Sequence, residues 1–235
     1  ADNNTAVGYY ALVSNTTGEQ NVAVGANALD ASTTGNYNTA TGYGALGANT
    51  TASDNTAFGA LTLLLNTTGT DNTACGMQAL GNNTTGNYNT GLGNLALLNN
   101  TTGNFNTAVG SHALDAVQTG SGNTALGYIA LTGNTADYNT GIGSYTLQAN
   151  TSGGANVALG TFALYNNTTA SNNTGLGYNA LLANTTGTGN TAVGKDALDS
   201  NTTASNNTAV GLDALEANTT GEQNTAVGAY ALDAN

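Results

Sequence analysis

A 17-residue phrase recurs along nearly the whole chain. Each copy opens with the pattern N-[TV]-[AG]-x-G, and the opening asparagines follow one another at a 17-residue step, with one 16-residue step between Asn123 and Asn139. They are Asn4, Asn21, Asn38, Asn55, Asn72, Asn89, Asn106, Asn123, Asn139, Asn156, Asn173, Asn190, Asn207 and Asn224. Such a period is typical of a solenoid, whose repeats contact only their neighbours. The sequence therefore predicts a single array over residues 1–235, with 14 repeats starting at Asn4 and one 16-residue repeat at 123–138.

The columns of the repeat differ in how much they vary. Counted from the opening asparagine, column 1 is Asn, column 5 is Gly and column 9 is Leu in every copy. Column 3 is Ala or Gly, and column 8 is Ala except for Thr62 and Thr146, whereas columns 6, 7, 10, 16 and 17 vary freely. Duplication alone would leave all columns equally alike. The contrast therefore separates structurally constrained columns from those that face solvent.

Composition favours strands over helices. The repeats are rich in Gly, Asn and Thr, which are poor helix formers, and the chain has no proline to interrupt a backbone ladder. We expect each repeat to form a strand, a bend near the column-5 glycine, a second strand and a turn through the Asn-Thr-Thr segment. The fold class predicted is thus all-β, a parallel β-solenoid of 14 coils, one for each 17-residue repeat. Coils stacked about 4.8 Å apart would align the opening asparagines into a hydrogen-bonded ladder.

Alternation along a strand indicates which columns face inward. In the first repeat it places Thr5 and Val7 on one face and Ala6 on the other. We assign column 4 and the column-9 leucines to the interior, so the column-2 threonines face inward too. Cys75, in column 4, is then a small core side chain rather than a reactive thiol. The column-5 glycine, such as Gly8, is expected where a Cβ atom would be forbidden.

The alanines of columns 3 and 8 do not fit that interior. If the strands alternate regularly, Ala6 and Ala11 of the first repeat point away from the interior that takes Val7 and Leu12. Constant small residues imply close packing, either within a more complex cross-section or against a second chain. Because a 17-residue coil encloses a thin core, we expect lateral association into a trimer; a monomeric flattened roll is the alternative.

Charge and hydropathy exclude two classes of partner. One basic residue stands against 13 acidic ones, a net charge of −12, so nucleic acid would be repelled. No apolar run approaches the ~20 residues that cross a bilayer, so this segment is not expected to insert into a membrane.

The repeat phrase also resembles known proteins. N-T-A-[VLI]-G-x-x-A-L, with NTTG before the next copy, resembles the repeats of bacterial and phage tail-fibre-type proteins. It is also similar to the S-V-A-I-G coils in the head domains of trimeric autotransporter adhesins. The resemblance covers all 14 repeats and implies a left-handed parallel β-roll, three chains side by side, displayed outside the cell for attachment.

Residues that could carry chemistry are few. His112 is the only histidine and Lys195 the only basic residue, and both occupy variable columns. A His/Cys metal site cannot be built from one His and one Cys, and a Ser–His–acid triad would have to use an exposed His112. We therefore predict no enzyme, and no catalytic, cofactor-binding or metal-ligating residues.

Three further patterns have alternative interpretations. Carboxylates gather in columns 7 and 10 of the last three repeats, where they would bind Ca²⁺ or form a solvated acidic edge. These are Asp196, Asp199, Asp213, Glu216 and Asp233. Aromatic residues gather in columns 6, 7 and 17, where they would stack on sugars, anchor a partner or fill a seam between chains. The Asn-Thr-Thr triplets match N-glycosylation acceptors, but the repeat itself generates them, which favours a structural role.

These observations predict a non-enzymatic extracellular or cell-surface fibre, an adhesin shaft that associates with itself as a homotrimer or filament. Surface glycans or proteins are further candidate partners. One alternative is an ice-binding (antifreeze) solenoid with threonine ladders, against which the inward-facing column-2 threonines weigh. Another is a purely structural filament subunit that stacks end to end.

Overall fold

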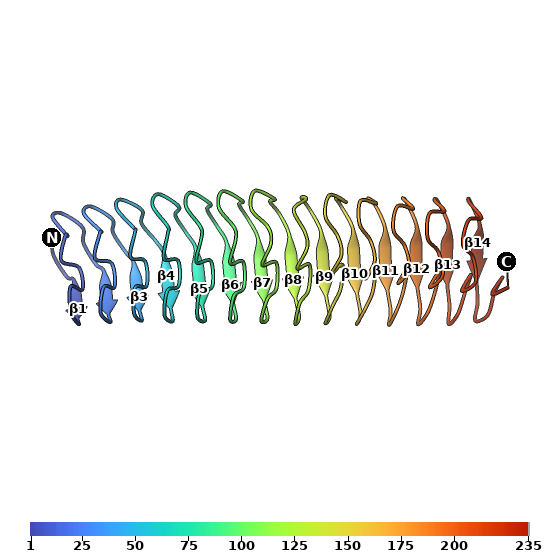
Figure 1. The fold of residues 1–235 in the computed structure, drawn as a ribbon, viewed down its shortest axis with the longest axis horizontal. Coiled ribbons are helices and arrows are strands. Elements are labelled where there is room, and N and C mark those ends of the chain that lie inside the picture. Colours follow the sequence, from blue (N-terminus) through green and yellow to red (C-terminus); the bar gives the residue numbers. More distant parts are fainter. Residues whose placement is uncertain (235) are drawn as a thin grey trace. The chain divides into compact units, whose positions relative to one another are not determined.

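The computed structural model describes residues 1–234, which form 14 three-residue β-strands and no helix. Each strand occupies columns 2–4 of one repeat (Figure 1). They are β1 (Thr5–Val7), β2 (Val22–Val24), β3 (Thr39–Thr41), β4 (Thr56–Phe58), β5 (Thr73–Cys75), β6 (Thr90–Leu92), β7 (Thr107–Val109), β8 (Thr124–Leu126), β9 (Thr140–Ile142), β10 (Val157–Leu159), β11 (Thr174–Leu176), β12 (Thr191–Val193), β13 (Thr208–Val210) and β14 (Thr225–Val227). The predicted all-β parallel solenoid, with one coil per repeat, is confirmed.

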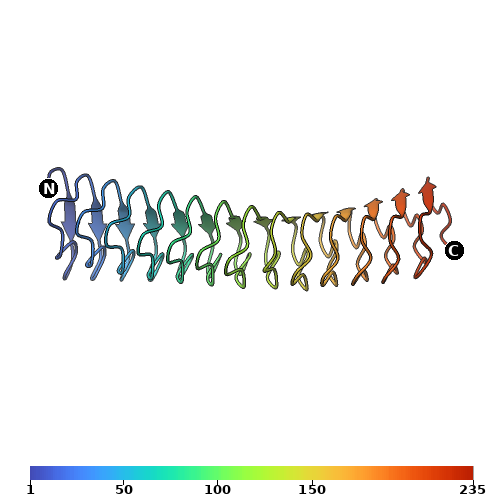
Figure 2. The same ribbon diagram turned by 90° about the horizontal axis from the view of Figure 1, so that it is seen from above.

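The chain divides into two compact units, Ala1–Ser121 with β1–β7 and Gly122–Asn235 with β8–β14. Within each unit, consecutive strands pair in parallel so that each column meets the same column of the next coil, as Phe58 meets Cys75 and Cys75 meets Leu92. Figure 2 shows this succession from above. The 16-residue repeat keeps the register, since Thr124 pairs with Thr140, so its missing residue is absorbed outside the strand.

A run of turns replaces the second strand that we expected in each coil, and that expectation is wrong. In the first coil, Ala11 N donates to Gly8 O at 3.3 Å and Val13 N donates to Tyr10 O at 3.3 Å. The third residues of these two turns are Tyr10 and Leu12, with φ of 57° and 52°. A positive φ at the third residue is what a type II turn requires. Overlapping turns therefore carry columns 5 to 10 around the end of the coil.

The interior consists of alanines and leucines. Ala23, Ala28 and Leu29, in columns 3, 8 and 9 of the second coil, are all fully buried. The leucines are inside as predicted, but column 4 is not: Val7 is 58% and Phe58 54% exposed. Alternation puts columns 3 and 4 on opposite faces, and the alanine takes the inner one. The parity argument for column 8 failed because columns 8 and 9 lie in a turn, where the chain does not alternate.

At the column-9 leucines, the free energy gained by side-chain burial exceeds the cost of a left-handed backbone. Leu29 has φ of 51°, a left-handed conformation that costs a non-glycine residue about 1–2 kcal/mol. Burial of a leucine side chain contributes about 1.5–3 kcal/mol. Burial outweighs backbone strain, so leucine occupies a position where backbone conformation alone would favour glycine.

The column-5 glycine leaves no room for a side chain, as predicted. Gly25 has φ of 137°, and a Cβ atom built there would lie 2.5 Å from the carbonyl oxygen of Gly42 in the next coil. Both the conformation and the distance between coils exclude every other residue.

Two ladders of buried asparagines join the coils. In column 1, the Asn38 backbone N–H donates to Asn21 Oδ1 at 2.9 Å, and Asn38 Nδ2 donates to Ala52 O at 2.9 Å. This confirms the predicted ladder. A second one runs along column 12, where Asn66 Nδ2 donates to Asn49 Oδ1 at 3.2 Å. Column 12 is the Asn of Asn-Thr-Thr; because Asn49 and Asn66 are fully buried, their amides are structural rather than open to glycosylation.

Candidate binding face

Each strand presents its column-2 and column-4 side chains to the outside of the coil, because the column-3 alanine between them points inward. In β4, Thr56 and Phe58 are exposed while Ala57 is buried; in β5, Thr73 and Cys75 are exposed while Ala74 is buried. The expectation that the column-2 threonines face inward is therefore wrong. We call this surface the strand face; it consists of a threonine rank in column 2 and an apolar rank in column 4.

The strand face is apolar and uncharged within both units. No strand among the described residues contains Asp, Glu, Lys, Arg or His. In the first unit the column-4 rank is Val7, Val24, Thr41, Phe58, Cys75, Leu92 and Val109. In the second unit it is Leu126, Ile142, Leu159, Leu176, Val193, Val210 and Val227. A run of mostly apolar side chains held in register on a sheet is a feature of interaction surfaces.

Cys75 lies on this face and not in the core, so the core prediction for this residue is wrong. Its thiol is free and exposed, with Phe58 on the neighbouring strand β4 and Leu92 on β6. The cysteine is therefore a natural reporter of whether the strand face is covered.

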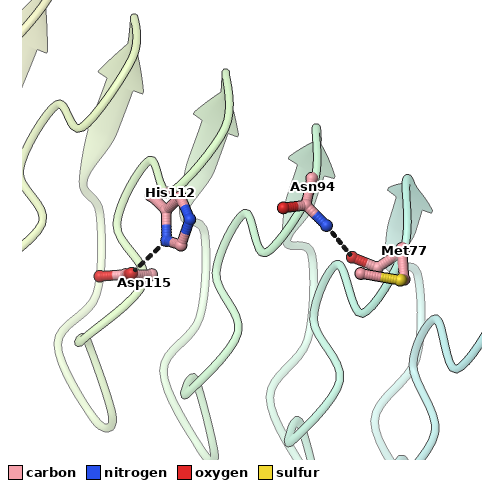
Figure 3. Close-up of polar contacts among 4 residues, drawn as sticks. All are labelled: Met77, Asn94, His112 and Asp115. Carbon is pink, nitrogen blue, oxygen red and sulfur yellow. Dashed lines mark hydrogen bonds and ion pairs between the residues drawn. The ribbon is translucent and has the colours of Figure 1, made fainter.

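The histidine lies on the turns, away from the strands. His112 Nδ1 and Asp115 Oδ2 are 3.0 Å apart within one turn, and the histidine side chain is 38% exposed (Figure 3). In the coils before it, Asn94 Nδ2 donates to Met77 O at 3.4 Å. Both contacts are local, the first within one turn and the second between adjacent coils, so they brace the turns.

The negative charge of the carboxylates in the last coils is only partly balanced by the one lysine. Lys195 forms an ion pair with Asp196. Burial raises the pKa of the Asp199 carboxyl, and the nearby Asp196 and Glu216 raise it further. Among residues 1–234, no three His, Cys, Asp or Glu side chains are grouped to hold a metal ion. Ca²⁺ binding and a solvated acidic edge both stay predictions, to be decided by titration.

Aromatic side chains of adjacent coils contact one another. The rings of Tyr145 and Phe162 stack at 5.4 Å with 17° between their planes, and Tyr128 and Tyr178 approach this pair edge-on. In the first unit, Tyr88 and Phe105 stack at 5.2 Å. These rings use part of their surface on each other, which supports a bracing role and leaves less of it for sugars.

Two hollows open on the surface, one in each unit. One of about 330 Å³ opens where Gly44 and Gly47 leave a gap between coils, with Leu61 and Leu64 on one side and Asp30 on the other. A second, of about 430 Å³, is lined by Asp137, Tyr138 and small polar residues. Neither lining contains a histidine or a cysteine.

Comparison of the chain with protein-family models, with curated proteins and with solved structures finds no match. Among the described residues there is no helix that is long and apolar enough to cross a membrane. The fold itself defines the class, a tandem-repeat protein built as a parallel β-solenoid.

Sequence reasoning missed the strand face, although one signal pointed to it. Column 4 ranges from Thr41 to Phe58 in size, whereas columns 3, 8 and 9 hardly vary. A close-packed interior tolerates little change in volume. The variation in size in column 4 is therefore a sign of exposure.

Proposed function

We propose that this chain is a non-enzymatic segment of an extracellular fibre or adhesin shaft, and that its strand face associates with another copy of the chain. The observation that carries the proposal is the apolar rank of column 4, which is exposed or half-buried in every coil: Val7 is 58%, Phe58 54% and Leu159 41% exposed, whereas Val24 and Val109 are half-buried.

Energetics support association through this face. Removal of apolar surface from water contributes roughly 25 cal/mol per Å². The side chains stand on hydrogen-bonded strands, so the backbone loses little further freedom on binding. The net charge of −12 makes copies repel elsewhere, whereas the strand face brings no carboxylates together.

The repeat phrase supports the extracellular part of the proposal. Its resemblance to tail-fibre-type repeats and to adhesin-head coils suggests display outside the cell, three chains side by side, and attachment to surface glycans or proteins. A shaft with many identical coils suits multivalent contact, in which weak sites add up along one molecule.

Sedimentation velocity of a matched pair of variants tests the association. Leu92→Asp places a charge on the strand face, where Leu92 is 37% exposed, and Leu65→Asp places one on a turn, where Leu65 is 43% exposed. We expect the wild type and Leu65→Asp to form oligomers and Leu92→Asp to sediment as a 23.1 kDa monomer. A wild type that stays monomeric at every concentration contradicts the proposal.

Ice binding is a second candidate, because the column-2 threonines face outward. They form an in-register rank on an uncharged sheet, as Thr56, Thr73 and Thr90 do. Bulky neighbours such as Phe58 make the face uneven, which favours the first proposal. Thermal hysteresis tests it: Thr73→Leu should abolish activity, whereas Thr68→Leu, at an exposed turn threonine, should keep it. No hysteresis in the wild type removes this candidate.

A further inference from the structure

From the geometry of the strand face we infer that its partner is a second copy of the first unit, turned end for end about a two-fold axis that runs along the strands between β4 and β5. This inference rests on the proposed self-association and specifies its arrangement. It differs from the three-chain bundle that the sequence resemblance implies.

Symmetry restricts how two strand faces can meet. If the second copy is rotated about the direction in which the coils stack, the strands reverse and each coil meets the same coil of the other copy. An axis over column 4 then sets Phe58 against Phe58, and an axis over column 3 sets column 4 of one copy over column 2 of the other. Apolar side chains such as Phe58 and Leu92 would then cover threonine hydroxyls. If it is rotated about the strand direction, column 4 lies over column 4 and column 2 over column 2. Only the second rotation can bury the apolar rank against itself with unlike coils opposed, so that Phe58 does not meet Phe58.

The sizes of the side chains place the axis. Along column 4, the large Phe58 stands between the smaller Thr41 and Cys75, and the larger Leu92 follows. Facing sheets lie about 10 Å apart and their side chains interdigitate, so a large residue needs a small one opposite.

An axis between β4 and β5 meets this requirement for strands β2–β7. It sets Phe58 opposite Cys75 of the other copy, and Thr41 opposite Leu92. It also sets Val24 opposite Val109, two residues of equal size. An axis through β4 itself would instead force two phenylalanines together, and overpacking of that kind is destabilising. The arrangement is closed and self-complementary, as in most soluble dimers.

Charge and area agree with a second copy as the occupant. The strand face has no charged group to attract a charged partner, and two such faces meet without repulsion. Six strands, β2–β7, about 4.8 Å apart make a strip roughly 25 Å long. Pairing over that strip falls in the smaller class of specific interfaces, below about 1,200 Å² in total. We therefore expect reversible, concentration-dependent pairing.

Cross-linking of single-cysteine variants of the full chain tests the arrangement. In a Cys75→Ser background, Thr41→Cys and Leu92→Cys are made separately, on chains of two distinguishable masses, and treated with a short bismaleimide. We expect the mixture to give a cross-linked heterodimer at several times the yield of either variant alone. The reason is that Thr41 faces Leu92 of the other copy but lies three coils, about 14 Å along the stack, from the other Thr41.

Other outcomes overturn the inference in distinguishable ways. If each variant cross-links alone as well as it does in the mixture, like coils meet, as they would in a three-chain bundle. If sedimentation shows oligomers but no sample cross-links above a Leu65→Cys control, another face is used. Both results leave the proposed self-association standing. A wild type that sediments only as monomer removes the proposed function together with the inference.

Discussion

Asn15 Oδ1 is buried and accepts no hydrogen bond, because the next coil carries Ser32 where other coils carry an asparagine. In an intact rung the following asparagine donates, as Asn83 Nδ2 does to Asn66 Oδ1 at 2.8 Å. A serine side chain is too short to reach, and Ser32 Oγ is itself buried without a partner. The column-12 ladder is therefore broken at this coil.

Ser32→Asn should repair the broken rung. An unsatisfied buried acceptor costs about 1–3 kcal/mol, so we expect the variant to gain about 1–2 kcal/mol of unfolding free energy in urea titrations. Val117→Asn is the informative comparison, because Asn100 Oδ1 lacks a partner where Val117 interrupts the same ladder. There the loss of a buried valine offsets the gain, so a smaller change is expected. Equal or no stabilisation in the two variants contradicts this account.

The column-5 glycines should tolerate no substitution. Gly25→Ala would place Cβ 2.5 Å from a backbone oxygen at φ of 137°, and we expect it to destabilise by about 4 kcal/mol or more. Gly44→Ala, at φ of 64°, would meet flexible side-chain atoms of Leu61 at 3.1 Å and Leu64 at 3.6 Å and should cost about 1 kcal/mol. Thermal and urea unfolding of the pair measure the difference; similar costs would show that contact between coils is not the cause.

At one position in column 17, substitution of alanine by glycine should stabilise the fold. Ala155 is exposed and has φ of 56°, so it adopts a left-handed backbone without the benefit of burial. We expect Ala155→Gly to stabilise by about 0.5–1 kcal/mol, the left-handed strain less the entropy lost by glycine. Ala217→Gly, at an exposed alanine without positive φ, should destabilise by a similar amount. Urea midpoints that move in the same direction for both variants would argue against the strain.

Asp199 should make stability depend on pH in a defined direction. Burial, with Asp196 and Glu216 nearby, raises the pKa of this carboxyl, so the folded chain holds the proton more tightly than the unfolded one. Stability therefore falls as pH rises through the folded pKa. At pH 7 we expect Asp199→Asn to resist urea better than the wild type, with the difference disappearing at pH values below the ordinary aspartate pKa of 3.8. A difference between the two chains that persists unchanged below that pH would contradict this account.

The sequence by itself determined the period, the parallel in-register stack, the column-5 glycine, the asparagine ladder and the inward leucines. A constant 17-residue step brings like columns together whatever the shape of one coil, and constancy of a column reports constraint. The sequence also predicted that the 16-residue repeat would form one coil of the stack, and in the structure Thr124 still pairs with Thr140.

The tertiary structure alone decided which face of the short strand is outside. Alternation specifies that Ala23 and Val24 point to opposite sides, but it cannot say which side closes on the leucines. That depends on the turns, where positive φ at positions such as Leu29 lets two consecutive residues face inward. The coil closes around the smaller side chains because so thin an interior has room for alanine beside leucine, and this leaves the larger column-4 residues on the surface.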